Sequence, residues 1–418
     1  MSLGSVPSRS VAKQRELSTD INSLAIGPRG APAVALGLCL LLVAACSERF
    51  ERIPAQGRVA GQPVATTVDD PIARYYLERD RPGTERDPLL ERRLATAFAP
   101  LSEGVPSRAE LARLSRELSP DLATIYLIEQ LAAVPANAAL QDRFQGHLSR
   151  VGVLAADGNP ELTACAAALD LPSVWFVPGW FYRSNPETGA DFHRQRALFE
   201  RLGIEHRLVP LVENGTIEAN AALIADQLRA LDPGRDRVML VSASKGGPEV
   251  AHALGHLLSP AETRPVEAWI NVGGPLRGSP LADWATSWPI AWLAPLYFAY
   301  VEERDPGESV ASLTTARSSA RLAREDIPGP ITVINFLGAP LSGQISASSE
   351  FGYGRMRALG PNDGLTPLID VLAHGGRTIV QVGLDHYYRD PELDLKTVAL
   401  ALTVASELPA PCRGANGP

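Results

Sequence analysis

Residues 237–247 read Arg237-Val-Met-Leu-Val-Ser-Ala-Ser-Lys-Gly-Gly247, a short apolar run that ends abruptly in small residues. The apolar run is typical of a buried strand, and the segment after it is typical of a helix. A serine on a tight strand-to-helix turn can be held clear of a sheet, beside backbone N–H groups that would receive an oxyanion. The stretch therefore predicts a nucleophile elbow with Ser244 at its tip. A serine in such a turn is also commonly a helix N-cap, so the stretch alone leaves that alternative open.

Short β-branched runs alternate with helical runs after residue 172. This alternation predicts an α/β fold with a doubly wound, mostly parallel sheet covered on both faces. The strands are expected at 174–177, 206–210, 238–241, 268–272, 331–336 and 378–382. The helices are expected at 190–203, 216–231, 246–258, 366–374 and 394–407. Parallel strands end at one edge of the sheet, so functional residues are expected at that edge.

A serine nucleophile needs a base and an acid that orients the base. Asp363 lies in the turn-forming stretch Gly360-Pro-Asn-Asp-Gly-Leu-Thr-Pro367, after the fifth expected strand, and His386 follows the sixth. Together with Ser244 they give a candidate catalytic triad at one edge. Asp385 is a rival acid, but neighbouring side chains on an extended backbone point apart. Ser242 is a rival nucleophile, but it lies nearer the strand body and has no glycine two places later.

The order serine, aspartate, histidine resembles that of the α/β-hydrolases, and in particular bacterial lipases and esterases, over residues 170–408. The stretches 273–283 and 362–364 resemble their post-strand and acid-loop segments. The resemblance implies an α/β-hydrolase fold, hydrolysis of a small-molecule or lipid ester through an acyl-enzyme, and no cofactor. It also implies that the backbone N–H groups of Lys245 and Trp180 receive the oxyanion. An acyltransferase with the same triad and a non-catalytic binding or scaffold protein are alternatives.

The chain departs from the family pattern at two places. Ser242 occupies the first glycine position of the usual G-x-S-x-G elbow, and Val177-Pro178-Gly179-Trp180 replaces an oxyanion loop that usually begins His-Gly. Serine is small enough for the elbow. The second departure bears on the substrate more than on the fold.

An uncharged apolar run at residues 31–44 precedes Cys46, and Leu42-Val43-Ala44-Ala45-Cys46 resembles the lipobox of bacterial lipoproteins. The resemblance implies a signal peptide over 1–45, acylation of Cys46, and a lipid anchor on a membrane of the bacterial cell envelope, with the outer membrane facing the periplasm favoured. An ordinary secretory peptide and a buried helix are alternatives.

The composition divides the rest of the chain. Residues 46–67 are expected to be a tether, 68–165 a helical region with a capping box at Ser107 and Glu110, 166–410 the hydrolase domain, and 411–418 a tail. An insertion at about 281–325 is expected to form a cap that offers an apolar wall to a substrate or only completes the core. Its aromatic residues are Trp284, Trp288, Trp292, Tyr297, Phe298 and Tyr300.

The chain has 418 residues and a formal net charge of −8. No cluster of Lys and Arg is present to neutralise phosphates, so a nucleic-acid partner is not expected. His252 and His256 share a helix face without the glutamate of a metal-binding motif, and no metal site is expected. Cys165 and Cys412, the two cysteines left after residue 46, are candidates for a disulfide, with two unpaired thiols as the alternative.

Overall fold

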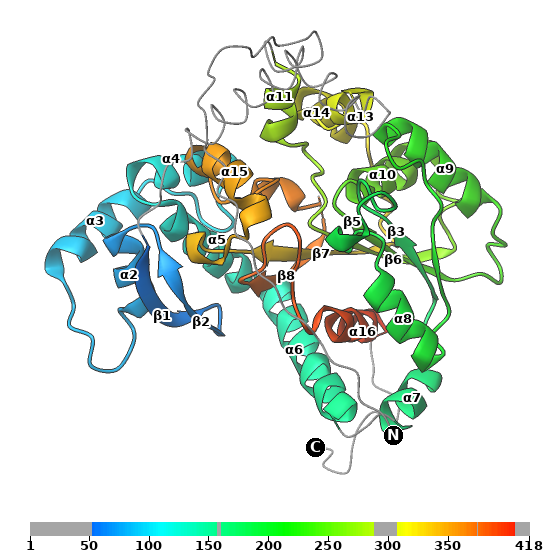
Figure 1. Cartoon of the computed structure of the whole chain (residues 1–418), viewed down its shortest axis with the longest axis horizontal. Helices are drawn as coiled ribbons and strands as arrows, with labels where there is room; N and C mark the ends of the chain where they lie inside the picture. Colours follow the sequence, from blue (N-terminus) through cyan, green and yellow to red (C-terminus); the bar gives the residue numbers. More distant parts are fainter. Residues whose placement is uncertain (1–51, 157–159, 288–306, 374, 406–418) are drawn as a thin grey trace, which may run out of the picture. The chain divides into compact units, whose positions relative to one another are not determined.

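The computed structural model describes residues 52–156, 160–287, 307–373 and 375–405, which form a six-stranded sheet at their centre (Figure 1). The strand order is β4-β3-β5-β6-β7-β8, and every neighbouring pair is parallel. The six expected strands are all present. Their bounds are β3 Ser173–Val177, β4 His206–Leu208, β5 Val238–Ala243, β6 Val266–Val272, β7 Thr332–Ala339 and β8 Arg377–Val382.

Helices cover both faces of this sheet (Figure 1). Val174 and Phe176 of β3 face a core shared with α8 (His193–Leu202), α16 (Leu393–Val404) and α6 (Pro135–Ala156). Trp175 and Val177 face a second core shared with α9 (Ile217–Arg229) and α10 (Gly246–His252), which continues as a π-helical turn Ala253–Leu257. Alternate side chains of a strand point to opposite faces, so both faces of β3 are apolar and buried. The structure confirms the predicted doubly wound, parallel α/β sheet.

The prediction of a tether over residues 46–67 is wrong from residue 53 onward. There β1 (Ile53–Val59) and β2 (Gln62–Val68) form an antiparallel hairpin. Val59, Val64 and Val68 are buried on one face of it. The turn between the strands has φ of 46° at Ala60 and 78° at Gly61. A two-residue turn with both φ values positive matches the twist of a hairpin. Alanine is unusual in the first of these positions, so the turn lacked the sequence signal of Asn-Gly.

Where the structure describes it, the expected helical region contains five helices before the sheet besides α6. They are α2 Pro71–Glu78, α3 Pro88–Phe98, α4 Arg108–Glu117, α5 Pro120–Ala133 and α7 Pro160–Ala167. The predicted capping box is present, since Ser107 Oγ accepts from the N–H of Glu110 and the Glu110 carboxylate accepts from the N–H of Ser107. The hairpin, α2 and α5 share a core with residues of β7 and β8. This region is therefore packed on the six-stranded sheet.

Side-chain amides of the N-terminal region close the free edge of β8. Their oxygens accept from alternate N–H groups of the strand. The N–H of Thr378 donates to Asn137 (2.8 Å), that of Val380 donates to Gln141 (2.9 Å), and that of Val382 donates to Gln62 (3.1 Å). The Gln62 amide also donates to the carbonyl of Val380 (2.8 Å). An unpaired edge can pair with another chain, and these amides take the place of a further strand.

Two elements on the carboxyl side of the sheet differ from expectation. The helix expected at 366–374 is a short 3₁₀ turn, Leu368–Val371, and α15 (Ala347–Met356) was not predicted. Two glycines, Gly352 and Gly354, weaken its helical pattern. Gly352 is required by packing, because a Cβ there would lie 1.9 Å from the carbonyl oxygen of Gly364.

The described part of the cap insertion consists of α11 (Pro280–Ala285), α13 (Gly307–Ser312) and α14 (Thr315–Leu322). Short 3₁₀ turns at Pro186–Thr188, Ser342–Gln344 and Arg357–Leu359 complete the elements. Trp284 belongs to α11, and the other aromatic residues of the expected cap lie outside the described residues.

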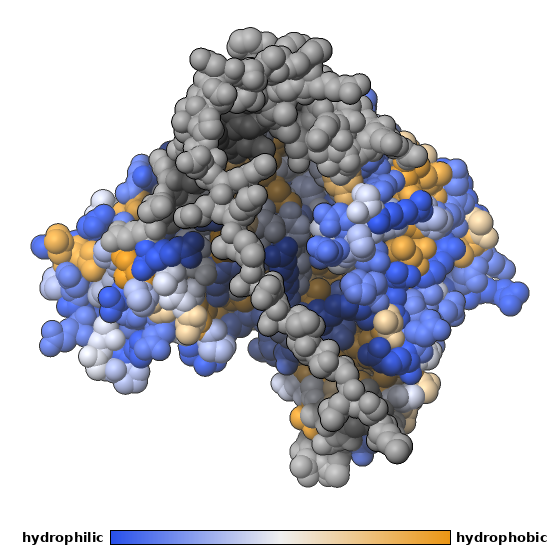
Figure 2. Space-filling view, in the orientation of Figure 1, coloured by the Kyte–Doolittle hydropathy of each residue, from blue (hydrophilic) through white to orange (hydrophobic). Residues whose placement is uncertain are grey.

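The described surface is mainly hydrophilic on the face that Figure 2 shows, with separate apolar patches. Within the described ranges no helix is long and apolar enough to cross a bilayer. The expected signal peptide and Cys46 lie outside those ranges.

Candidate active site

Ser244 sits on a sharp turn between β5 and α10. Its φ is +49°, in the left-handed region that a non-glycine residue occupies only where its surroundings hold it there. Its N–H donates to the carbonyl of Val272 (3.0 Å), and its carbonyl accepts from the N–H of Gly247 (2.9 Å). A Cβ at Gly246 would lie 2.8 Å from two carbonyl oxygens at the end of β3, so the turn needs glycine there. This is the backbone geometry of the predicted elbow.

The structure brings the three candidate triad residues together. Ser244 Oγ lies 2.9 Å from Nε2 of His386, and Nδ1 of His386 lies 2.8 Å from Oδ2 of Asp363. The backbone N–H of His386 also donates to the carbonyl of Asp363 (2.9 Å). The three residues follow β5, β7 and β8, whose carboxyl ends meet at one edge.

The Asp363 carboxylate is oriented by its own turn. Its Oδ1 accepts from the N–H groups of Leu365 (2.9 Å) and Thr366 (2.7 Å). Gly364, between Asp363 and Leu365, has φ of +97°, which favours glycine. With Oδ1 engaged by the backbone, Oδ2 is the oxygen that faces the imidazole.

Electrostatics favour the protonated form of His386. Burial alone would lower the pKa of this imidazole, but the charge and hydrogen bond of Asp363, together with the charge of Asp385, raise it above its ordinary value. The imidazole can therefore take up a proton from Ser244 in a buried site and remain stable as the cation.

The two rival residues are occupied elsewhere. Asp385 accepts from the N–H groups of Ser346 (2.9 Å) and Tyr387 (3.1 Å) through separate oxygens. It thus ties the loop that carries His386 to the loop after β7, a role that the sequence did not indicate. Ser242 is fully buried, and its hydroxyl accepts from the indole N–H of Trp269 (2.9 Å).

The two expected oxyanion donors lie on loops that converge at Ser244. A Cβ built on Gly179 would come within 3.3 Å of the Cβ of Ser244, which places the loop after β3 against the elbow. The N–H of Gly179 donates to the carbonyl of Ala190 (3.0 Å). The next N–H, of Trp180, and the N–H of Lys245 donate to no acceptor in the part of the chain that the structure describes.

The other expected residues take no part in this arrangement. His252 and His256 stack with 5.0 Å between ring centroids, and Nδ1 of His252 lies 3.1 Å from Glu325. Among the described residues, no group of three or more His, Cys, Asp or Glu could hold a metal ion. Cys165 is buried and disulfide-bonded, and Cys412 lies outside the described residues.

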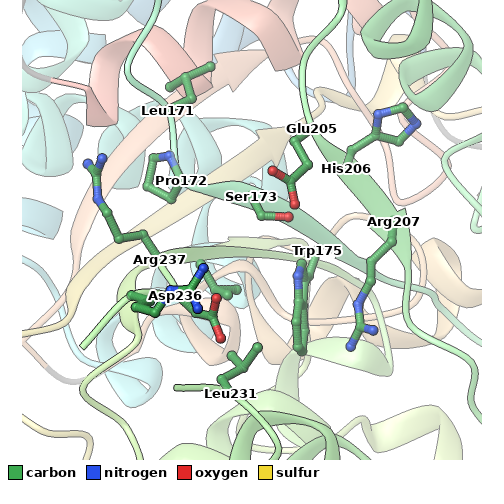
Figure 3. Close-up of a pocket in the computed structure, with 12 residues that line it drawn as sticks. Leu171, Pro172, Ser173, Trp175, Glu205, His206, Arg207, Leu231, Asp236 and Arg237 are labelled. Atoms are coloured by element: carbon green, nitrogen blue, oxygen red, sulfur yellow. The ribbon is translucent and has the colours of Figure 1, made fainter. Parts of the chain in front are cut away.

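A cavity of about 400 Å³ lies at the amino ends of the strands, opposite the carboxyl ends that carry Ser244 (Figure 3). Its lining comes from the amino ends of β3, β4 and β5 and includes Ser173, His206, Arg207 and Arg237. Ser244 follows the carboxyl end of β5, so this cavity is separate from the candidate active site.

The strand order and the parallel pairing define an α/β-hydrolase fold. No protein-family model and no curated protein matches the sequence. Among solved structures, the chain is similar to the metagenomic carboxyl esterase MGS0156, at 22% identity over 56% of this chain and 76% of that one, with a TM-score of 0.45. It is also similar to mature Bacillus licheniformis lipase BlEst2, at 26% identity over 56% of this chain and 92% of that one, with a TM-score of 0.44. A third similar structure is EstA from Clostridium botulinum, at 10% identity over 58% of this chain and 89% of that one, with a TM-score of 0.42.

Proposed function

We propose that this protein is a serine hydrolase that cleaves carboxylic esters through an acyl-enzyme. The observation that carries the proposal is the continuous contact from Ser244 through His386 to Asp363, with 2.9 and 2.8 Å between the paired atoms. A serine hydroxyl is a weak nucleophile, and a base and an orienting acid at these distances are what activates it.

The reaction would proceed in two steps. Neutral His386 takes the proton of Ser244 Oγ as the oxygen attacks the ester carbonyl carbon, and it then gives that proton to the departing alcohol. Water, deprotonated by the same imidazole, attacks the acyl carbonyl carbon. The bond from that carbon to Ser244 Oγ breaks, His386 returns the proton to Oγ, and the acid is released. Asp363 holds the imidazole tautomer throughout. The N–H groups of Trp180 and Lys245 would receive the negative oxygen of each tetrahedral intermediate, at about 3 kcal/mol of stabilisation for each such donor.

A lipidic ester is the substrate class we favour. The support is the aromatic-rich composition of residues 281–325 and the lipase-like stretch 273–283. An apolar wall next to the nucleophile would take up an acyl chain.

A panel of p-nitrophenyl esters of increasing acyl length, run on the wild type and on Ser244→Ala, tests the proposal. We expect ester cleavage by the wild type, a preference for longer chains, and loss of activity in the variant. Equal activity of the two proteins would refute the role of Ser244. A wild type inactive on every ester would favour a binding or scaffold role, and ester products with an added alcohol would favour acyl transfer.

We also propose that the protein is anchored to a membrane of the bacterial cell envelope through acylated Cys46. The lipobox-like stretch supports this, and several acyl chains give lasting attachment by burial of their methylenes. The expected result is that the full chain enters the detergent phase on phase separation, whereas Cys46→Ser stays in the aqueous phase. Equal partition of both proteins would count against the anchor.

A further inference from the structure

The two proposed oxyanion donors belong to separate loops, and both loops are connected to one segment, Leu211–Glu213. The Trp180 loop is bonded to it directly, and the elbow reaches it through Glu249 and Asn220. Trp180 lies on the loop after β3, and Lys245 lies on the elbow after β5. The segment follows β4 and leads into α9, which lies beside α10 (Figure 1).

The first half of this connection holds the Trp180 loop. The hydroxyl of buried Tyr182 donates to the carbonyl of Leu211 (2.9 Å). The N–H groups of Arg183 (2.8 Å) and Ser184 (2.7 Å) both donate to Oε1 of Glu213, and the Ser184 hydroxyl donates to the same atom (2.9 Å). One carboxylate oxygen thus fixes two consecutive peptide groups of the loop.

The second half reaches the elbow through α9. The Asn220 amide accepts from the N–H of Val212 (3.1 Å) and donates to its carbonyl (2.9 Å). The same amide donates to Oε1 of Glu249 (2.8 Å), and Glu249 forms an ion pair with Lys245. Lys245 and Glu249 are 2% and 1% exposed, so neither charge has water as an alternative partner.

The backbone is strained at both ends of this connection. Phe181, next to Trp180, has φ of +53°, and Ser244, next to Lys245, has φ of +49°. A non-glycine residue in this region is strained and persists only where neighbouring contacts fix it. Each donor N–H thus adjoins a strained residue that would relax if its loop were released.

We propose that Glu213, Asn220 and Glu249 are positioning residues that hold the N–H groups of Trp180 and Lys245 at the separation that the oxyanion requires. The inference rests on the proposed ester hydrolysis. Donors stabilise developing charge only when they are already in place, so a bridge between two loops acts on the transition state more than on substrate binding.

Glu213 offers the cleanest test, because it is partly exposed and a matched pair of variants exists. Glu213→Gln keeps an acceptor oxygen for the loop N–H groups, and Glu213→Ala removes it. We expect Glu213→Ala to lower kcat about tenfold with KM changed less than about twofold, since a displaced donor costs less than the 10²–10³ of a deleted one. The affinity for an aryl boronic acid, which forms a tetrahedral adduct with the serine, should fall by the same factor. Glu213→Gln should restore both within about threefold.

Other outcomes would overturn the inference. Glu213→Ala with wild-type kcat and boronate affinity, even at a lower Tm, would show a structural role alone. Equal losses in the Gln and Ala variants would show that the acceptor atom is irrelevant. Asn220→Ala breaks the link between Val212 and Glu249, and it should lower kcat as Glu213→Ala does. Its folding is checked by circular dichroism. An unchanged kcat in a folded Asn220→Ala would also refute the proposed connection between the loops. A wild type that neither cleaves esters nor binds the boronate would refute the proposed function itself, whereas an active wild type equal to Glu213→Ala would refute only this inference.

Discussion

Two carboxylates lie near His386, and replacing each by its amide separates their roles. Asp363→Asn and Asp385→Asn remove the same charge and change almost no volume. Asp363 faces Nδ1 of the imidazole at 2.8 Å, whereas Asp385 bonds to two backbone N–H groups. The account predicts very different losses from two chemically identical changes.

The size of each loss follows from the contacts. In Asp363→Asn the amide oxygen keeps the N–H groups of Leu365 and Thr366, so the amide NH₂ faces Nδ1 of His386. The imidazole must then accept at Nδ1 and carry its proton on Nε2, where it cannot accept a proton from Ser244. A wrong tautomer of this kind costs about 10⁴ in kcat, or about 5 kcal/mol.

Asp385→Asn loses at most one of its two hydrogen bonds, because the amide oxygen can keep one N–H. One bond to a charged carboxylate contributes about 1.5–3 kcal/mol, so kcat should fall by about 150-fold at most. The assay is kcat and KM on a short p-nitrophenyl ester for both variants and the wild type, with Tm measured on each. A loss of 10³ or more in Asp385→Asn, together with an active Asp363→Asn, would refute the assignment of Asp363 as the orienting acid.

The raised pKa of His386 places the acid limb of kcat/KM above the ordinary histidine value of 6.5, because only the neutral imidazole accepts a proton. A pH–rate profile that stays flat down to pH 6 would contradict this. Gln141→Ala leaves the N–H of Val380 without its acceptor and should lower the free energy of unfolding in urea by about 1–3 kcal/mol, whereas Gln141→Glu keeps an acceptor and should lower it less. No difference between these two variants would show that the β8 edge does not need the amide. In Gly179→Ala the new Cβ lies 3.3 Å from the Cβ of Ser244, so the loop must move by a few tenths of an ångström and kcat should fall about tenfold at nearly unchanged Tm; a wild-type kcat would place the loop away from the reacting atoms.

Local patterns explain what the sequence could predict. The strands β5, β7 and β8 each contain a short apolar run, and Ser244, Asp363 and His386 each follow one of them. Because parallel strands end at a common edge, the order of the motifs along the chain was enough to place the three side chains together. Asp385 was correctly set aside, since neighbouring side chains point apart.

Contacts between polar residues far apart in the chain explain what the sequence could not predict. Gln141 lies on α6, where an isolated glutamine is typical of a solvated helix face, yet its amide meets the edge of β8. The first hairpin has too few apolar residues to stand out from a polar tether. Lys245 and Glu249 have the spacing of a helical ion pair, but the sequence did not show that both charges are buried or that Asn220 joins them to another loop.

Labelling with a fluorophosphonate tests the central claim most directly, because the reagent forms a covalent bond only with an activated serine. The account predicts one adduct on the intact protein, mapped to Ser244 by peptide mass spectrometry, and none on Ser244→Ala. It also predicts that the adduct forms much more slowly in Asp363→Asn. A folded wild type that forms no adduct, or an adduct on another residue that persists in Ser244→Ala, would contradict the account.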